Sequence, residues 1–299
     1  MLVSVIIPFY NRYLLLQRCL QGLRQQRFAD FEIILVDDGS TEAMPSYLQT
    51  QYLHWHRLNY IRLSQNQGRS AARNQGLLLA KAPLILFLDS DMFVEPDFIY
   101  QHWYWHQSKG AGWIGQGKII GTPDFIQQAP ASLWTDASRA QFATGNVSVS
   151  RQALMDTGGF DTEFSAYGFE DLELGFRLKQ AGQRFDTVHK AVSWHYEPPL
   201  SELNWQEDIA KERARGHGAA LFYQKHPCLE VRLIAQLTPL HPLLDQFLRF
   251  GGLITEARWQ HYLPTLYAKH PKLALAIYRG LLNRYCSQAT RNSLQNKSP

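Results

Sequence analysis

The segment from residue 84 to residue 93, LILFLDSDMF, constrains the fold more than any other part of this chain. Its apolar run ends abruptly in Asp89-Ser90-Asp91, which is typical of a buried strand where it leaves its sheet. Because residues i and i+2 of an extended chain project to the same side, Asp89 and Asp91 are expected to face one point. A divalent cation carrying a diphosphate would offset their repulsion. A solvated acidic turn is the alternative that this segment leaves open.

Strands and helices alternate through the first third of the sequence. We expect strands at residues 3–8, 31–36, 60–63 and 84–88, a helix capped by Asn11 and a second helix at 70–80. This alternation predicts an α/β fold with a mostly parallel sheet flanked by helices. Three of the strands end in polar residues: Tyr10-Asn11, Asp37-Asp38 and Asp89-Ser90-Asp91. These ends should meet at one sheet edge and form a crevice for a nucleotide.

The glycine pattern argues against the two common phosphate-binding loops. The first strand runs into PFYNR rather than G-x-G-x-x-G, and G-x-x-x-x-G-K-[ST] does not occur in the sequence. The phosphates of a bound nucleotide would then be neutralised in another way, which favours a metal on the aspartates.

The rest of the chain is less regular at first and then helical. We expect strands at 113–120, 145–150 and 188–194, with a helix at 170–181 that ends at Gly182. Beyond residue 203 we expect helices at 210–224, 229–237, 242–250 and 271–285, followed by a frayed polar tail after Ser287.

The net charge of +4 is concentrated near the C-terminal end. Residues 200–299 contain 13 Lys/Arg and 7 Asp/Glu. A solvated helical surface explains this surplus, and attraction to anionic lipid or to an acidic acceptor is the alternative. The three cysteines show no paired or metal-like spacing, and the apolar start is too short for a signal peptide or a membrane span. We therefore expect a cytoplasmic protein.

Eight motifs in a fixed order carry a resemblance to a known family. They are VSVIIPFYNR, FEIILVDDGST, NQGRSAARNQG, ILFLDSDMF, TGNVSVSR, GGFDTEF, YGFEDLELGFRLKQAG and WHYEP. Over about residues 1–200 the chain resembles family 2 glycosyltransferases of the GT-A fold, with Asp89-Ser90-Asp91 as the DXD motif. FEDLELGFRL is similar to the galactosyl- and N-acetylgalactosaminyltransferase branch, which includes chondroitin-polymerase-type domains.

The resemblance also implies a division of labour along the chain. Residues 1–111 would form the nucleotide-sugar-binding half of the GT-A domain, and residues 112–200 the acceptor-binding and catalytic half. Residues 201–299 would form a helical extension.

The activity implied by the resemblance is transfer of a hexose or N-acetylhexosamine from a UDP-sugar to a glycan or glycolipid hydroxyl, with Mn²⁺ or Mg²⁺. The metal ligands would be Asp89, Asp91 and His195. The nucleotide sugar would be contacted by Pro8, Tyr10, Asp38, Arg69, Arg73, Asp89 and Asp91. We expect no nucleic acid partner. A peripheral contact of the basic C-terminal region with the inner membrane leaflet stays open.

The Glu170-Asp171 pair opens the helix expected at 170–181. Acidic residues favour a first helical turn for dipole reasons alone. Here Tyr167-Gly168-Phe169 precedes the pair, and aromatic faces stack on sugars. Because an inverting transfer needs a base opposite the leaving diphosphate, we predict Asp171 as that base and Glu170 as a hydroxyl-binding residue. For Asn146, a bond to a sugar hydroxyl and a bond to its own backbone both stay open.

Three other functions are weighed against this one. A retaining GT-A enzyme is compatible with the sequence. A nucleotidyltransferase would share the acidic metal site but should carry a glycine-rich basic loop after the first strand, which PFYNR does not supply. A non-catalytic nucleotide-sugar or glycan-binding scaffold would be expected to lose the candidate catalytic residues, and Asp89, Asp91, Asp171 and His195 are all present.

Overall fold

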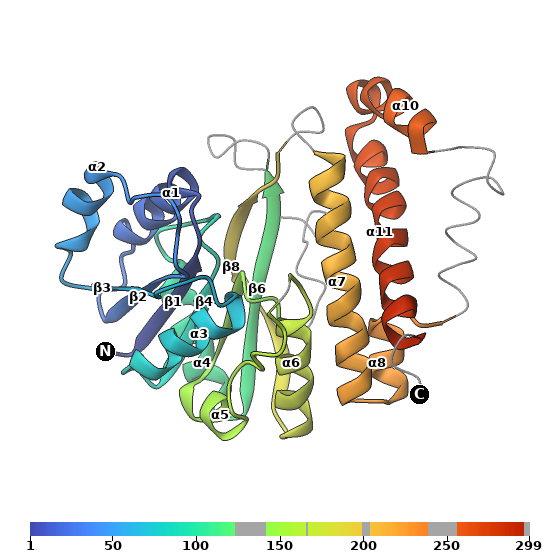
Figure 1. Cartoon of the computed structure of the whole chain (residues 1–299). Helices are drawn as coiled ribbons and strands as arrows, with labels where there is room; N and C mark the ends of the chain where they lie inside the picture. Colours follow the sequence, from blue (N-terminus) through green and yellow to red (C-terminus); the bar gives the residue numbers. More distant parts are fainter. Residues whose placement is uncertain (123–141, 166, 199–203, 239–255, 296–299) are drawn as a thin grey trace. The chain divides into compact units, whose positions relative to one another are not determined.

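The computed structural model describes residues 1–122, 142–165, 167–198, 204–238 and 256–295. The chain divides into two compact units. Residues 1–165 and 170–197 form the first, and residues 166–169 and 198–299 form the second. The first unit contains the sheet and the second is helical in its described part (Figure 1). The division expected at residues 111 and 112 stays a prediction.

An eight-stranded sheet lies at the centre of the first unit, in the order β3-β2-β1-β4-β7-β6-β8-β5. Six strands run in one direction, whereas β7 and β5 run against their neighbours. The predicted α/β fold with a mostly parallel sheet is therefore confirmed. The strands are β1 (Val3–Phe9), β2 (Phe31–Asp37), β3 (Leu58–Arg62), β4 (Leu84–Leu88), β5 (Met92–Val94), β6 (Trp113–Thr122), β7 (Asn146–Ser150) and β8 (Arg184–Tyr196).

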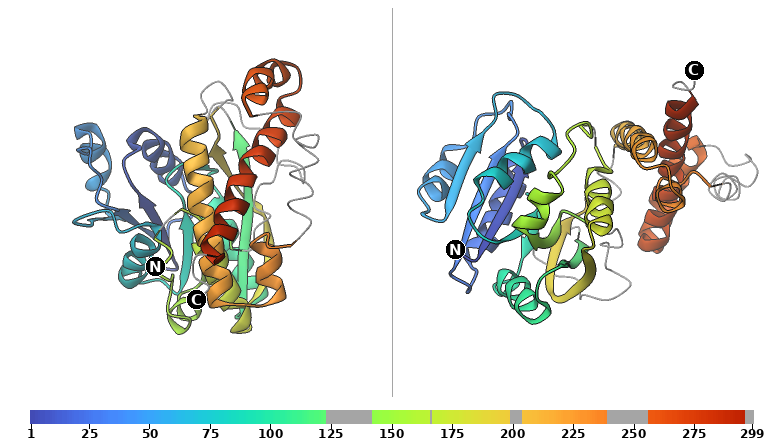
Figure 2. Two further views of the ribbon diagram at one scale, coloured as in Figure 1. Left: turned by 45° about the vertical axis from the view of Figure 1, so that its right-hand side comes forward. Right: turned by 90° about the horizontal axis from the view of Figure 1, so that it is seen from below.

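Helices cover both faces of this sheet (Figure 2). Successive residues of the central strands point to opposite sides and therefore belong to two different cores. Val5 belongs to the core under α1 (Tyr13–Arg24) and α4 (Phe98–Lys109), together with the short α2 (Ser46–Leu48) and the π-helix at Gln49–Leu53. Its neighbour Ile6 belongs to the core under α3 (Arg69–Leu79), α5 (Arg151–Asp156) and α6 (Glu170–Gln180). Both faces being buried explains why these strands read as continuous apolar runs.

The chain changes direction across the sheet between β1 and β4. From β1 it proceeds outward to β2 and β3, and then returns to place β4 on the other side of β1. Open α/β sheets bind ligands at the carboxyl ends of the strands where the order reverses in this way. Since β1, β2 and β4 are parallel, the residues that follow them, Tyr10, Asp38 and Asp89, lie at one edge as predicted.

The predicted cap at Asn11 was wrong. Helix α1 is preceded by Arg12 and begins without a side-chain capping bond. The Asn11 side chain is engaged elsewhere, because its Oδ1 accepts hydrogen bonds from the backbone N–H groups of Thr41 (3.0 Å) and Glu42 (3.3 Å). Tertiary contacts with the loop after β2 thus override the local capping preference.

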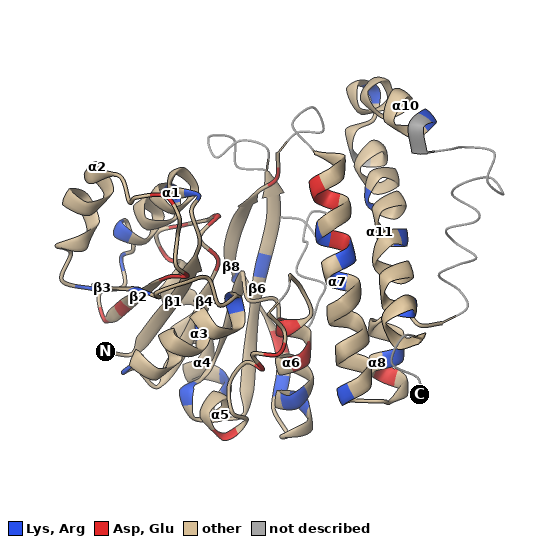
Figure 3. Cartoon of the chain, viewed as in Figure 1, with Lys and Arg blue, Asp and Glu red and all other residues tan. Residues whose placement is uncertain are grey.

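Helix α6 shows that local signals specify an element well where they agree. Acidic residues occupy its first turn and Arg177 and Lys179 its last, which complements the helix dipole (Figure 3). Gly182 follows with φ 86°, and the Gln183 N–H donates to the Leu178 carbonyl, so the predicted glycine ending is confirmed.

The described residues of the second unit form α7 (Trp205–Lys225), α8 (Leu229–Ile234), α10 (Glu256–Lys269) and α11 (Pro271–Gln295). Helices α7 and α11 lie side by side (Figures 1 and 2). A Cβ at Gly216 would lie 2.4 Å from the Cys286 carbonyl oxygen, so glycine permits this close approach. No helix among the described residues is long and apolar enough to cross a membrane.

Three helices of the second unit were predicted, although their bounds differ. The expected helix at 242–250 lies outside the described residues, and α10, which carries Pro264 in its interior, was not predicted. The expected frayed tail was wrong, since α11 continues to Gln295. Ala289 and Thr290 explain this, because both are buried in the unit despite the polar sequence around them.

A buried polar network joins α4 to β7 inside the first unit. The Asn146 side chain donates to the carbonyls of Lys118 and Ala191 and accepts at Oδ1 from the ring of His102 at 2.8 Å. The other His102 ring nitrogen lies 2.8 Å from Ser148 Oγ. Asn146 therefore serves the packing of β6, β7 and β8, and its side chain bonds the backbone of neighbouring strands rather than its own.

We expect this network to make the fold acid-sensitive. Burial lowers the pKa of His102 to about 3 and that of His106 to about 4, so the folded state keeps both rings neutral. The unfolded chain binds protons near pH 6.5, so stability is full above that pH and falls as the pH drops below it, by up to about 1.4 kcal/mol per pH unit for each ring.

Urea unfolding between pH 7 and pH 5 tests this expectation. His102→Gln should lower the slope by up to about 1.4 kcal/mol per pH unit, whereas the exposed His54→Gln should leave it unchanged. Equal slopes in the wild type and His102→Gln would contradict it.

Candidate active site

Arg73 is the centre of the candidate site. It lies on α3, its side chain is 1% exposed, and it bridges two carboxylates. Nη2 donates to Asp89 Oδ1 at 2.9 Å and Nη1 to Glu170 Oε1 at 3.1 Å, with the Phe160 ring 5.4 Å from the guanidinium carbon. This guanidinium therefore joins the end of β4 to the start of α6. Its predicted contact with a nucleotide stays a prediction.

The Glu170-Asp171 pair begins α6 with two carboxylates in different surroundings. Glu170 is buried, and its Oε2 has no hydrogen-bond partner in the described part of the chain. Asp171 is half-buried and accepts a hydrogen bond from the Leu172 N–H at 2.8 Å. Burial raises the pKa of Asp171 to about 7, and the charge of Glu170 adds to this, although Arg73 opposes it. Asp171 can thus change protonation state near neutral pH.

Asp91 and His195 are brought together by the pairing of β5 with β8, which sets Met92 opposite His195. His195 Nε2 lies 3.4 Å from Asp91 Oδ2. Burial opposes the charge of Asp91, but its bond with His195 and the charges of Arg12 and Arg69 outweigh this and lower its pKa. Burial likewise disfavours a charged His195, yet the Asp91 carboxylate raises its pKa.

The fit of a divalent cation to these residues is partial. Asp91 Oδ1 is buried and has no hydrogen-bond partner among the described residues, and carboxylate with imidazole is a donor set that suits Mn²⁺. Asp89, however, is already paired with Arg73. No three His, Cys, Asp or Glu side chains converge as a metal cluster within the described residues. Asp91 and His195 could hold an ion whose other ligands come from the diphosphate and water.

Asp38 braces the loop that leads into α3. Its two oxygens accept hydrogen bonds from the backbone N–H groups of Gln67 (2.8 Å) and Gly68 (2.9 Å). Burial raises the pKa of Asp38, while these two backbone bonds oppose the change. Each oxygen of Asp38 keeps a second lone pair for a further hydrogen bond. The predicted contact with the nucleotide's base stays a prediction. Pro8 is buried in β1, and Tyr10 is 39% exposed just beyond it.

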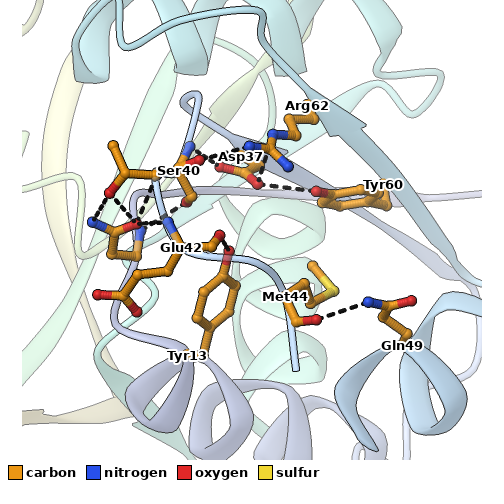
Figure 4. Close-up of polar contacts among 10 residues, drawn as sticks. Tyr13, Asp37, Ser40, Glu42, Met44, Gln49, Tyr60 and Arg62 are labelled. Atoms are coloured by element: carbon orange, nitrogen blue, oxygen red, sulfur yellow. Dashed lines mark hydrogen bonds and ion pairs between the residues drawn. The ribbon is translucent and has the colours of Figure 1, made fainter. Parts of the chain in front are cut away.

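Sequence reasoning missed the role of Asp37, which holds the loop after β2 (Figure 4). Its Oδ1 accepts from the Ser40 N–H at 2.8 Å and its Oδ2 from the Tyr60 hydroxyl at 2.9 Å. Arg62 donates to the Ser40 carbonyl, and the Tyr13 hydroxyl donates to the Glu42 carbonyl. The signal was the adjacent pair Asp37-Asp38, because neighbouring residues at a strand end point to opposite sides.

Arg12 was also missed. Its Nη1 lies 3.6 Å from Asp91 Oδ2, although the two residues are 79 positions apart in the sequence. The signal was the cation in PFYNR, which follows β1 at the same sheet edge as Asp91.

We expect Arg73→Met to destabilise the fold by about 3–5 kcal/mol, because Glu170 would be left as a buried, unpaired carboxylate. Adding Glu170→Gln to that variant should recover part of the loss, since the buried charge is then removed. Guanidinium unfolding of the wild type, both single variants and the double variant measures the coupling. If the losses of stability in the two single variants simply add in the double variant, the ion pair between Arg73 and Glu170 is not coupled as expected.

The family comparison agrees with the motifs. The model described as "Glycosyl transferase family 2" matches residues 4–160, which is more than half of the chain. A second model, "N-terminal domain of galactosyltransferase", matches residues 131–197. Together these matches cover the sheet and the site residues described above.

Relatives include enzymes that are much longer than this chain. The hyaluronan synthase of Pasteurella multocida is 31% identical over 70% of this chain but only 26% of its own length. The chondroitin synthase of Escherichia coli is 29% identical over 67% of this chain and 35% of its own length. Validoxylamine A glucosyltransferase of Streptomyces hygroscopicus subsp. jinggangensis (strain 5008) is 29% identical over 88% of this chain and 70% of its length.

Solved structures share the fold. The mannosyltransferase PcManGT from Pyrobaculum calidifontis, in complex with GDP-Man and Mn²⁺, has a TM-score of 0.64 at 18% identity, over 99% of this chain and 88% of its own. S. aureus TarS 1–349 in complex with UDP-GlcNAc has a TM-score of 0.56 at 17% identity, over 99% and 92%. With the sequence matches, these place the chain: it belongs to glycosyl transferase family 2 and is a glycosyltransferase of the GT-A fold.

Proposed function

We propose that this enzyme transfers a hexose or N-acetylhexosamine from a UDP-sugar to a glycan or glycolipid hydroxyl, with inversion and with a divalent cation. The observation that carries this proposal is the bridge that Arg73 forms between two carboxylates. It ties Asp89, the first aspartate of the DXD motif, to Glu170, and Asp171 with its pKa of about 7 is the next residue in the chain. The candidate base Asp171 and the carboxylates of Asp89 and Glu170 therefore belong to one electrostatic cluster around Arg73.

A UDP-sugar is the donor that the relatives favour. TarS is a neighbour whose complex holds UDP-GlcNAc, and hyaluronan and chondroitin synthases are among the relatives. PcManGT, which has the higher TM-score, holds GDP-Man, so a GDP-sugar is the competing donor. Because those neighbours are below 25% identity, they support the choice of donors to test rather than a single donor.

In the proposed reaction Asp171 accepts the proton of the acceptor hydroxyl. The acceptor oxygen forms a bond to the anomeric carbon as the bond from that carbon to the diphosphate oxygen breaks, and its electron pair leaves with UDP. Asp91 and His195 would hold the cation, which when bound offsets the charge on the departing diphosphate. Arg69, which lowers the pKa of Asp91 by its charge, adds positive charge on the same side. Glu170, fixed by Arg73, is proposed to bind a sugar hydroxyl through Oε2.

Location and acceptor belong to the same proposal. We propose a cytoplasmic enzyme, because Cys19, Cys228 and Cys286 are free thiols. The basic surplus of residues 200–299 would suit peripheral contact with an anionic leaflet that carries a lipid-linked acceptor. Flotation with anionic vesicles, repeated with neutral ones, separates this contact from an ordinary solvated surface.

A donor panel tests the proposed function. With UDP-, GDP- and TDP-sugars, we expect Mn²⁺-dependent release of UDP from one UDP-sugar, lost with EDTA and reduced roughly 100-fold in Asp91→Ala. The anomeric configuration of the product, read by NMR, decides between inversion and retention. Turnover without metal would overturn the roles given to Asp91 and His195. No binding or turnover of any donor would favour the scaffold.

We expect Asp171→Asn to lower kcat by about 10²–10⁴-fold with little change in KM, because it removes the base without removing a binding surface. Since the base must be deprotonated, kcat/KM of the wild type should rise with pH through about 7, the pKa set by burial, Glu170, Arg73 and Asp89. Asp156→Asn, an exposed carboxylate change on α5, is the matched control. A variant that keeps the wild-type rate would rule out Asp171 as the base.

A further inference from the structure

Arg12 is held in an unusual backbone conformation. Asn11 has φ 54° and Arg12 has φ 52° and ψ 40°, so two consecutive non-glycine residues are left-handed. Each residue in this conformation is strained, because its Cβ crowds the following carbonyl oxygen. The loop after β2 enforces the conformation, because the Asn11 N–H donates to Ser40 Oγ at 2.8 Å and Asn11 Oδ1 accepts from the Thr41 N–H. Strain of this kind, maintained by surrounding contacts, concentrates at functional positions.

The strained turn directs the Arg12 side chain to Asp91. Nη1 lies 3.6 Å from Asp91 Oδ2, and the Arg12 side chain is 56% exposed. An ion pair with such an exposed partner is weak, because solvent screens the attraction between the two charges. The guanidinium is therefore placed at the carboxylate without being fixed there.

The charges around Asp91 change sign when a divalent cation binds. Asp91 is faced by Arg12, Arg69 and His195, so its single negative charge is already well compensated. A divalent cation on Asp91 would repel the guanidinium of Arg12 at its present distance. A diphosphate brought by the donor would attract it, and the planar fork of arginine suits phosphate oxygens. Helix α1, which begins after Arg12, has no acidic residue in its first turn to compete for that charge.

We propose, on the basis of the proposed function, that Arg12 is an exchangeable counter-charge of the donor site. It neutralises Asp91 until a cation binds there, and it then turns to the diphosphate of the donor. Arg12 thereby opposes binding of the cation alone and favours binding of cation and nucleotide together. By linkage, the nucleotide raises the affinity for the cation and the cation raises the affinity for the nucleotide by the same factor.

Mn²⁺ titration followed by the EPR signal of the free ion tests this proposal, with and without UDP as the nucleotide probe. Arg12→Gln should bind Mn²⁺ alone about three- to tenfold more tightly, because a competing cation is removed. The same variant should bind UDP about tenfold more weakly when Mn²⁺ is present. Arg12→Lys, which keeps the charge, should retain the Mn²⁺ affinity of the wild type and lose part of the UDP affinity.

Arg18→Gln is the matched control, since Arg18 is an exposed arginine of α1, the helix that follows Arg12. It should leave both affinities at the wild-type values, and thermal unfolding shows whether each variant is folded. Weaker binding of both Mn²⁺ and UDP by Arg12→Gln, or no change in either, overturns the proposal. If the wild type binds neither probe, the proposed function fails as well. If the wild type turns over a donor while Arg12→Gln behaves like Arg18→Gln, this inference alone fails.

Discussion

The buried guanidinium of Arg73 is the interaction on which the candidate site depends. Burying charges in a protein interior costs several kcal/mol for each ion, and only close partners offset that cost. Arg73 has two such partners, Asp89 from the end of β4 and Glu170 from the start of α6. Because either carboxylate would be costly to bury alone, the strand end and the helix start are held at a fixed separation. The segments around Asp89 and Glu170 thus form one structural unit.

The acidic residues of the site fall into two groups by how completely their oxygens are satisfied. Asp37 and Asp38 accept hydrogen bonds at both side-chain oxygens, Asp37 from Ser40 and Tyr60 and Asp38 from Gln67 and Gly68, and they brace the loops after β2 and β3. Asp91 and Glu170 each keep one buried oxygen without a partner in the described structure. Fully satisfied carboxylates stabilise a loop, whereas unsatisfied ones retain the capacity to bind an ion or a hydroxyl.

The matches to known proteins follow the same division of the chain. Both family models end by residue 197, where the first compact unit also ends. The helices α7, α10 and α11 lie beyond those matches and form a core of their own around Ile209, Tyr278 and Leu282. Relatives that share the first unit include enzymes of which this chain spans about a quarter to a third.

The sequence by itself determined the α/β class, the edge at which Tyr10, Asp38 and Asp89 gather, and the ends of α6. These follow from apolar runs, strand direction and local helix signals, which depend on neighbouring residues alone. It did not determine α4, whose aromatic residues lack a clear helical period, or the helical C-terminal tail. Only the tertiary structure decided that Asn11 grips the loop after β2, that Arg73 bridges two carboxylates and that Arg12 meets Asp91. Each of these contacts joins residues distant in sequence, and its energy depends on burial, which a linear pattern does not contain.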